Sequence, residues 1–268
     1  MPACVSDLDI KVPSTDERYI IEGWIELGGY ARVLVSRSLP YNSTVGKADL
    51  FDLLVDEAQV KVKCDTIEER LLLVEDTMYS ILPIYRGFKI RGEVGKTYTL
   101  EVKIGDQIFT STDNLLNPIK PDSLWFSPEA LNDSLGYIHI RIKDPPVLGN
   151  YYRIFTKRLG LDIDYNSMSV GALDDHLFNG TTFSLPIIRS GPSTKTADGH
   201  FFRKGQRVVV KTCIITKQYF DFISKVSTEL GETLSPLSFQ APAITLMTGG
   251  ALGGFGCYAG ITDTLEIH

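Results

Sequence analysis

The stretch Thr248-Gly249-Gly250-Ala251-Leu252-Gly253-Gly254-Phe255-Gly256 interrupts the last strand-like run of the 268-residue chain. Glycine loses more backbone entropy on folding than any other residue, so such a cluster indicates left-handed turns, a β-bulge or backbone packed closely against a neighbour. We interpret it as a structural bulge or tight loop, with a surface loop that meets a partner as the alternative. Gly254 to Ala259 fit the dinucleotide pattern G-x-G-x-x-A. That pattern also needs a following helix and an acidic residue about 20 positions on, which the residues up to His268 do not provide.

Length and composition indicate a globular protein of two domains. The chain is longer than a usual single domain of about 100 to 150 residues, and 43% of its residues are hydrophobic. The net charge of -6 argues against a polyanionic partner, so no nucleic-acid binding is expected. No run reaches the roughly 18 consecutive apolar residues of a transmembrane helix.

Cys4 is the candidate lipidation site. Met1 is not followed by the basic and apolar regions of a signal peptide, but Pro2-Ala3-Cys4 looks like the end of a bacterial lipobox, in which small residues precede an acylated cysteine. Met1 stands where a lipobox usually has leucine, and a stray terminal cysteine is the alternative. With lipid on Cys4, residues 1–18 would be an anchor and polar tether that holds the protein on a membrane without spanning it.

Short alternating segments predict an N-terminal β-sandwich domain over residues 19–117. The expected strands are residues 19–25, 31–37, 58–64, 71–74, 98–104 and 107–110. Gly28-Gly29 and Gly105-Asp106 are the expected hairpin turns, and residues 49–55 fit either a short helix or a strand. Gly95-Lys96-Thr97 matches the end of a phosphate-binding loop, but Ile90 stands where that loop requires glycine and a strand follows, so no nucleotide is expected.

Turn residues and two prolines between Asp113 and Asp122 predict a domain boundary there. The C-terminal domain, residues 118–268, is expected to be β-rich, with one amphipathic helix over residues 217–230. Thr216 is the expected N-cap of this helix and Gly231 its C-terminal stop. Its apolar stripe predicts packing on a sheet, and binding of a partner is the alternative.

Two acidic loops come nearest to a set of metal ligands: Asp162-x-Asp164-x-Asn166 and Asp174-Asp175-His176. The first begins like a calcium loop but lacks its glycine and its final glutamate. The second would need a turn for three adjacent side chains to converge. We therefore expect solvated loops, no metal and no cofactor. No catalytic signature is present either, although glycosidase carboxylates leave none, so a hydrolase that uses Asp174 and Asp175 is an alternative.

The other cysteines, Cys64, Cys213 and Cys257, form no C-x-x-C pair, which argues against a zinc or dithiol redox site. We expect them to be buried structural thiols. A disulfide between distant strands stays open.

Several short motifs in a fixed order carry a family resemblance: Cys4, residues 21–25, 36–38, 95–100 and 121–123, Asp144, residues 150–153, 202–210 and 249–258. In these motifs the chain resembles the Bacteroidota lipoproteins of unknown function that form the domain family four-two-four-nine. The resemblance implies an outer-membrane lipoprotein, often encoded beside TonB-dependent receptors. It also implies a transthyretin-like or immunoglobulin-like N-terminal sandwich, and it supplies no catalytic residues.

The expected function is therefore that of a cell-envelope binding or accessory lipoprotein, lipid-anchored in the outer membrane beside a TonB-dependent transporter. Tyr151, Tyr152, Phe255 and Tyr258 are candidate partner contacts, because amphipathic rings are favoured at interfaces and glycine permits close approach. The alternative is that these rings fill the second core. A surface hydrolase and an adhesin or assembly module are the alternative functions.

Overall fold

The computed structural model describes residues 17–38, 49–75, 82–189, 198–232 and 245–268. The chain is mainly β, as expected, and its described strands form three sheets. The strands of the first part are β1 (Tyr19–Glu26), β2 (Tyr30–Arg37), β3 (Gln59–Cys64), β4 (Ile67–Arg70), β5 (Leu72–Val74), β6 (Ile84–Arg91), β7 (Thr97–Ile104) and β8 (Gln107–Asn114). The second part holds β9 (Ser123–Glu129), β10 (Asn132–Lys143), β11 (Tyr151–Arg158), β12 (Asn166–Ser167), β13 (Leu173–Asp174), β14 (Thr182–Ile187), β15 (Phe202–Arg203), β16 (Arg207–Ile215) and β17 (Leu252–Glu266). The helices are α1 (Asp49–Asp52) and α2 (Lys217–Glu232).

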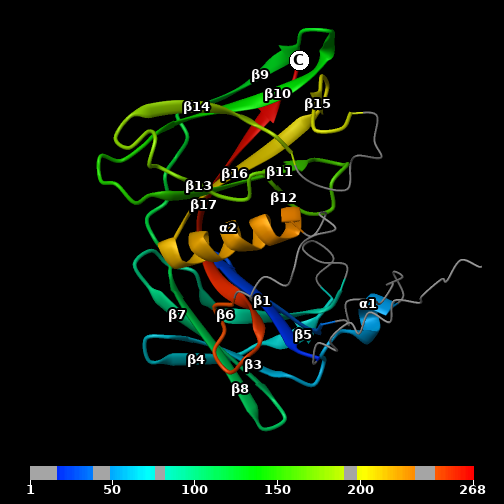
Figure 1. Cartoon of the computed structure of the whole chain (residues 1–268), viewed down its shortest axis with the longest axis vertical. Helices are drawn as coiled ribbons and strands as arrows, with labels where there is room; N and C mark the ends of the chain where they lie inside the picture. Colours follow the sequence, from blue (N-terminus) through cyan, green and yellow to red (C-terminus); the bar gives the residue numbers. More distant parts are fainter. Residues whose placement is uncertain (1–16, 39–48, 76–81, 190–197, 233–244) are drawn as a thin grey trace, which may run out of the picture.

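Strands β1 to β8, here called the lower unit, form a sandwich. A sheet in the order β4-β3-β7-β8 packs against β1, β2, β6 and β5, at the bottom of Figure 1. Period-two alternation is visible in β3 and β7, where Val60, Val62, Leu100 and Val102 are buried and the residues between them are more exposed. The segment that fitted a helix or a strand contains α1, and its Leu54 then forms a bridge with Ser36 of β2.

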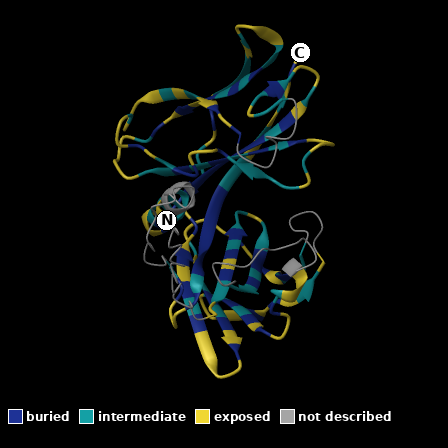
Figure 2. Cartoon of the chain, turned by 45° about the vertical axis from the view of Figure 1, so that its right-hand side comes forward, coloured by how far each residue is buried: buried dark blue, intermediate teal, exposed yellow. Residues whose placement is uncertain are grey.

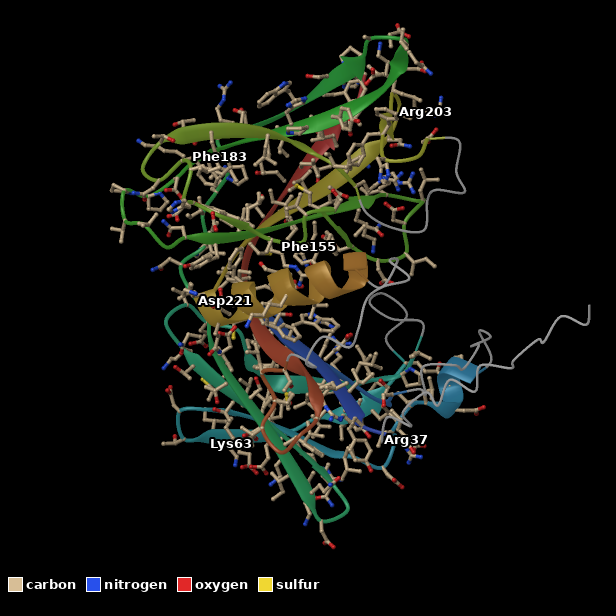
Figure 3. The ribbon with its side chains drawn as sticks, viewed as in Figure 1. Arg37, Lys63, Phe155, Phe183, Arg203 and Asp221 are labelled. Atoms are coloured by element: carbon tan, nitrogen blue, oxygen red, sulfur yellow. The ribbon has the colours of Figure 1, made fainter. Side chains whose placement is uncertain are left out.

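Strands β9 to β16, here called the upper unit, form a second sandwich-like arrangement. The sheet of β14, β10 and β15, with β9 on β10, packs against β11 and β16. Tyr152 is buried between them and meets Phe183 edge-on at 5.8 Å between ring centroids. Phe183 is labelled in the upper part of Figure 3. The inward residues of β10 are Ile138, Ile140 and Ile142, and His139 lies on the other face.

The last strand, β17, belongs to both units. Its residues 252–258 pair in parallel with β1, and its residues 259–266 pair antiparallel with β16. One sheet of nine strands therefore runs through the molecule, and β17 connects its two parts (Figure 1). The domain boundary at residues 118–122 stays a prediction. The structure adds that β17 pairs with β1, which precedes this boundary, and with β16, which follows it.

The glycine-rich stretch allows β17 to lie against its neighbours. At Gly253 the backbone has φ +100°, and a Cβ there would lie 2.1 Å from the carbonyl oxygen of Ile21 in β1. Only glycine adopts that conformation at so close an approach without strain. Buried residues extend from Gly253 to Ala259, and Figure 2 shows the buried strands where the two units meet. From Gly253 on, the stretch is thus packed inside the chain, whereas Thr248, Gly249 and Gly250 are exposed in the turn that precedes β17.

Helix α2 crosses the junction of the two units (Figure 1). It begins after Thr216, whose hydroxyl accepts the Tyr219 N–H at 3.4 Å, as expected for an N-cap. It ends at Glu232, two residues beyond the predicted end. Its apolar face packs on β17 and β11, so the predicted packing on a sheet is confirmed.

Candidate functional site

An aromatic layer lies between α2 and the sheet. Tyr219 of α2 stacks on the bare backbone of Gly256, where a Cβ would lie 2.5 Å from the ring. Its hydroxyl group is 2.9 Å from the hydroxyl of Tyr258. Phe155 meets Tyr258 edge-on at 5.7 Å, and its label in Figure 3 lies beside α2. The layer thus buries two phenol groups, and each hydroxyl finds a hydrogen-bond partner in the other.

Arg153 places a positive charge in this aromatic layer. The residue comes from β11, on the same strand face as Tyr151 and Phe155, and its Nη1 donates to the Tyr258 hydroxyl. Its guanidinium carbon lies 4.9 Å from the Phe155 ring centroid and 5.6 Å from that of Tyr258. The aromatic faces stabilise the cation by attraction to the ring quadrupoles. Among the described residues, its Nε is buried without a hydrogen-bond partner.

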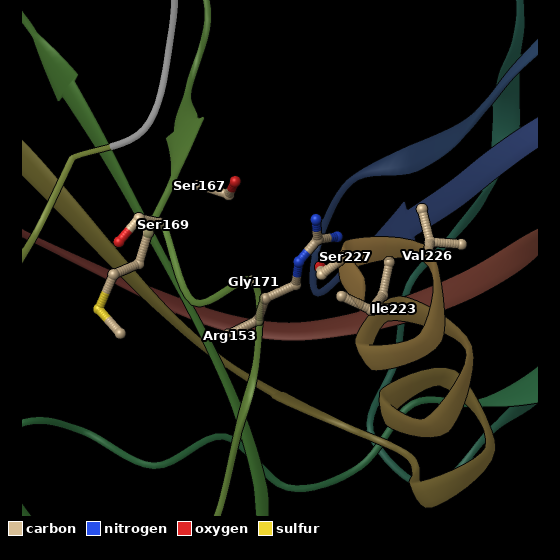
Figure 4. Close-up of a pocket in the computed structure, with 8 residues that line it drawn as sticks. Arg153, Ser167, Ser169, Gly171, Ile223, Val226 and Ser227 are labelled. Atoms are coloured by element: carbon tan, nitrogen blue, oxygen red, sulfur yellow. The ribbon is translucent and has the colours of Figure 1, made fainter. Parts of the chain in front are cut away.

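The guanidinium projects into a pocket between β12 and α2 (Figure 4). The pocket has a volume of about 310 Å³. Its lining residues are Arg153, Ser167, Met168, Ser169, Gly171, Ile223, Val226 and Ser227. Gly171 has φ +77°, and a Cβ there would lie 2.7 Å from the Ser227 hydroxyl oxygen, so glycine lets this loop approach the helix. The described lining combines one cation, hydroxyl groups and an apolar wall, and it includes neither a carboxylate nor an imidazole.

A second buried charge lies farther along the same sheet. Lys211 Nζ of β16 pairs with Glu26 Oε1 of β1 at 2.7 Å. The ammonium group also lies 4.1 Å from the ring centroid of Tyr165 and 5.2 Å from that of Phe155. Because Lys211 already has its own carboxylate, it differs from Arg153, which has no carboxylate partner among the ion pairs of the described residues.

Asp113 of β8 joins the lower unit to α2 and β17. Its carboxylate accepts hydrogen bonds from the Thr216 hydroxyl at 2.6 Å and from the Cys257 N–H at 2.7 Å. The side chain is fully buried. Burial raises the pKa of this carboxyl group above its ordinary value, and the hydrogen bonds from Thr216 and Cys257 oppose that shift in part.

A family model described as "Domain of unknown function (DUF4249)" matches residues 5–264. The chain belongs to the DUF4249 family. The match covers both units, β17 and α2, so the resemblance seen in the short motifs is confirmed for the family. No curated protein matches the chain. Bacteroidota origin and lipid attachment stay predictions.

The candidate partner contacts of the DUF4249 chain are mostly buried. Tyr152 and Phe255 are 0% exposed and Tyr258 is 6% exposed, so these three rings fill the interior, which is the alternative left open above. Tyr151 is partly exposed and packs on Phe220 of α2 at 4.7 Å between ring centroids. A partner could reach the first three only if the chain opened.

The side chains of Asp162 and Asp175 are mostly buried and form structural hydrogen bonds, so the expectation of solvated loops is wrong for these two residues of the DUF4249 chain. Asp162 binds the Arg158 guanidinium, with a shortest distance of 2.6 Å. The buried Asp175 accepts the backbone N–H groups of Gly149 and Asn150. Burial alone would raise the pKa of Asp175, but these donors lower it below its ordinary value.

The remaining acidic candidates, Asp164 and Asp174, do not form a common site with Asp162 and Asp175. Asp174 is exposed in β13 and accepts the backbone N–H of His176 at 3.2 Å, and Asp164 lies in the loop that leads to β12. Within the described ranges no group of three or more His, Cys, Asp or Glu residues is arranged to hold a metal ion.

Cys64, Cys213 and Cys257 are free thiols, and Cys213 and Cys257 are fully buried. Cys4 lies outside the described residues. No helix in the described part of the chain has the length and apolar character needed to cross a membrane.

Sequence reasoning did not identify Arg153 or Asp113. Arg153 belongs to one of the family motifs, and in β11 it alternates with the buried Tyr152 and Ile154, so it faces away from the sandwich core. Nothing in that alternation predicts that α2, more than sixty positions later, covers the face. Asp113 is separated by 144 residues from Cys257, to which it bonds, and no local pattern marks such a contact.

Proposed function

We propose that this DUF4249 chain is a cell-envelope binding or accessory protein that works beside a TonB-dependent outer-membrane transporter. The observation that carries the binding role is the Arg153 pocket, which has a fixed cation, hydroxyl groups and an apolar wall. Such a lining suits the holding of a ligand. General acid and base catalysis needs carboxylate or imidazole groups in reach, and the lining residues that the structure describes offer neither. The hydrolase alternative therefore gains no support from this pocket.

Lipid attachment at Cys4 would bring the protein to its partner. A protein tethered in a membrane meets its neighbours there at high effective concentration, so a weak contact is enough for a working complex. The polar residues between Cys4 and β1 provide the spacer that this arrangement needs. The outer-membrane location and the transporter come from the family resemblance and from Cys4.

Membrane fractionation tests the anchor. The full-length gene carrying Cys4→Ser is expressed in a host with a lipoprotein pathway, beside the wild type and a matched Cys64→Ser variant. We expect wild type and Cys64→Ser in the outer-membrane fraction and Cys4→Ser outside it. If Cys4→Ser also remains with the outer membrane, lipid attachment at this residue is contradicted.

Co-purification tests the partner. The lipidated protein is isolated from native outer membranes in mild detergent, with the Cys4→Ser protein as the control. We expect a TonB-dependent receptor to be enriched with the lipidated form only. Recovery of the protein without any such receptor, under conditions that keep other receptor complexes intact, would reject the transporter role.

A further inference from the structure

Two other arginines of this chain show how a guanidinium pairs with a carboxylate here. Arg158 binds Asp162 through Nε at 3.0 Å and Nη2 at 2.6 Å. Arg203 binds Asp198 through the same two nitrogens, with Nε at 3.0 Å. In both cases the planar side edge of the guanidinium receives a carboxylate. Both nitrogens of Arg203 donate to Asp198 Oδ1, whereas Arg158 contacts both oxygens of Asp162.

Arg153 has the same edge and no carboxylate on it. Tyr258 occupies Nη1, the nitrogen outside that edge, and the described residues supply no partner for Nε. A buried donor left without an acceptor is destabilising, because it loses its hydrogen bonds to water and gains none in the protein. The aromatic rings of Phe155 and Tyr258 stabilise the cation but offer no acceptor to the edge. The charge is thus held in place. Burial raises the pKa of the Glu22 carboxyl group and the charge of Arg153 opposes that shift, but no carboxylate of the described residues forms an ion pair with the guanidinium.

The rest of the pocket indicates the size and character of the missing group. Three serines, Ser167, Ser169 and Ser227, bring hydroxyl groups to the lining, and Ile223 and Val226 form an apolar wall on α2. Figure 4 shows the Arg153 guanidinium between Ser167 on one side and the helix residues Ile223, Val226 and Ser227 on the other. A volume of about 310 Å³ is at the small end of ligand pockets, which span roughly 300 to 1,000 Å³.

We propose that this pocket binds a small aliphatic carboxylate. The carboxylate group pairs with the Arg153 guanidinium, the Ser227 hydroxyl beside it donates to a remaining lone pair, and the short chain contacts Ile223 and Val226. Inorganic phosphate lacks an apolar part and fits the helix wall less well. This inference rests on the binding role proposed above and names the class of ligand. Its failure is distinguishable, because titration tests the pocket, whereas membrane fractionation and co-purification test the anchor and the transporter.

Calorimetric titration of the purified full chain tests the proposal. The probe is butyrate, with butyramide as its uncharged analogue and inorganic phosphate as the purely anionic one. We expect saturable butyrate binding in the millimolar range or tighter, at least tenfold weaker phosphate binding and no measurable butyramide binding. A lack of butyrate binding overturns the proposal. Equal binding of butyramide, or tighter binding of phosphate, overturns the assignment to carboxylates.

Three variants connect the binding to the pocket. Arg153→Lys keeps the charge but loses the planar edge, and Val226→Phe fills the pocket from the helix without touching the arginine. Each is expected to weaken butyrate binding at least tenfold. Arg91→Lys is the matched control, because Arg91 is exposed and its guanidinium lies 4.4 Å from the Tyr30 ring centroid, away from the pocket.

Circular dichroism confirms the fold of each variant before titration. If Arg153→Lys does not fold, Val226→Phe decides the question alone. Unchanged butyrate binding in a folded Val226→Phe protein would place the ligand elsewhere and overturn the proposal.

Discussion

Gly253 sets how closely β17 can approach β1. Its φ of +100° lies in the left-handed region, and the position that a Cβ would occupy overlaps the Ile21 carbonyl group. The two costs, conformational and steric, act at one residue. Gly250, also at positive φ but with nothing within 4 Å of the same position, carries only the first.

Replacement of these glycines separates the two costs. We expect Gly253→Ala to lower the free energy of unfolding by roughly 3 kcal/mol or more, because backbone strain and overlap combine. Gly250→Ala should cost about 1 kcal/mol, from backbone strain alone. Urea denaturation measures both values. Equal losses for the two variants would show that the contact with Ile21 contributes nothing.

Asp113 makes stability depend on pH in an unusual direction for a carboxylate. Its pKa in the folded state is raised by burial, so the stability it contributes is full below the unfolded-state pKa. That contribution is lost as the pH rises through the folded-state pKa, since the charged form is the one that burial disfavours. We expect the free energy of unfolding of Asp113→Asn, minus that of the wild type, to increase as the pH rises through the acid range.

Urea titrations at a series of pH values measure this difference. Asp106→Asn, at an exposed hairpin turn, is the control and should give a flat difference. A difference for Asp113→Asn that falls with rising pH would contradict the assignment of a raised pKa.

The buried thiols should be inert. Burial raises the pKa of Cys213 to about 12 and raises that of Cys257 as well, so almost no thiolate exists at neutral pH. We expect iodoacetamide to label neither residue in the folded protein and both in urea. Peptide mass spectrometry identifies the labelled sites. Native-state labelling of Cys213 as fast as that of the partly exposed Cys64 would disprove the buried placement.

At the scale of elements, local periodicity and long-range pairing differ in how well a sequence reveals them. The apolar stripe of α2 and its capping threonine are local features, and they predicted the helix to within two residues of its end. The parallel pairing of β1 with β17 joins residues 20–26 to residues 252–258. That pairing follows from the topology of the whole chain. The glycines indicated close backbone contact in β17, but not which strand makes it.

Substitution of Thr216 tests how much the N-cap of α2 contributes to the free energy of unfolding. Its hydroxyl group accepts from the Tyr219 N–H and donates to Asp113, so Thr216→Ala removes a cap and leaves a buried carboxylate with one donor fewer. We expect a loss of about 1 to 2 kcal/mol in the free energy of unfolding. Thr216→Ser keeps the hydroxyl and should lie within about 0.5 kcal/mol of the wild type. Similar losses for both variants would mean that the hydroxyl group of Thr216 does not account for the stabilisation.

For the whole molecule, shared strands predict cooperative unfolding. Strand β17 completes the sheet of each unit, and Asp113 bonds the lower unit to both β17 and α2. Neither unit can unfold without exposing part of the other. The two tryptophans report on the two units separately, because Trp24 lies in β1 and Trp125 in β9.

Single-tryptophan variants therefore test this cooperativity. We expect Trp125→Phe, which leaves Trp24, to show a fluorescence transition in urea that coincides with its circular-dichroism transition. The same coincidence is expected for Trp24→Phe. Two separated transitions in either variant would show that the units unfold independently.

The parallel pairing of β1 with β17 also decides how the molecule would bear a mechanical load. A pull on the residues before Tyr19 draws β1 toward its own start, while the upper unit holds β17 at its far end. Two parallel strands drawn from opposite ends slide past one another, so their hydrogen bonds are loaded together rather than opened one at a time. Under a load applied at the amino terminus, the pairing of β1 with β17 would thus carry the force in shear through the sheet.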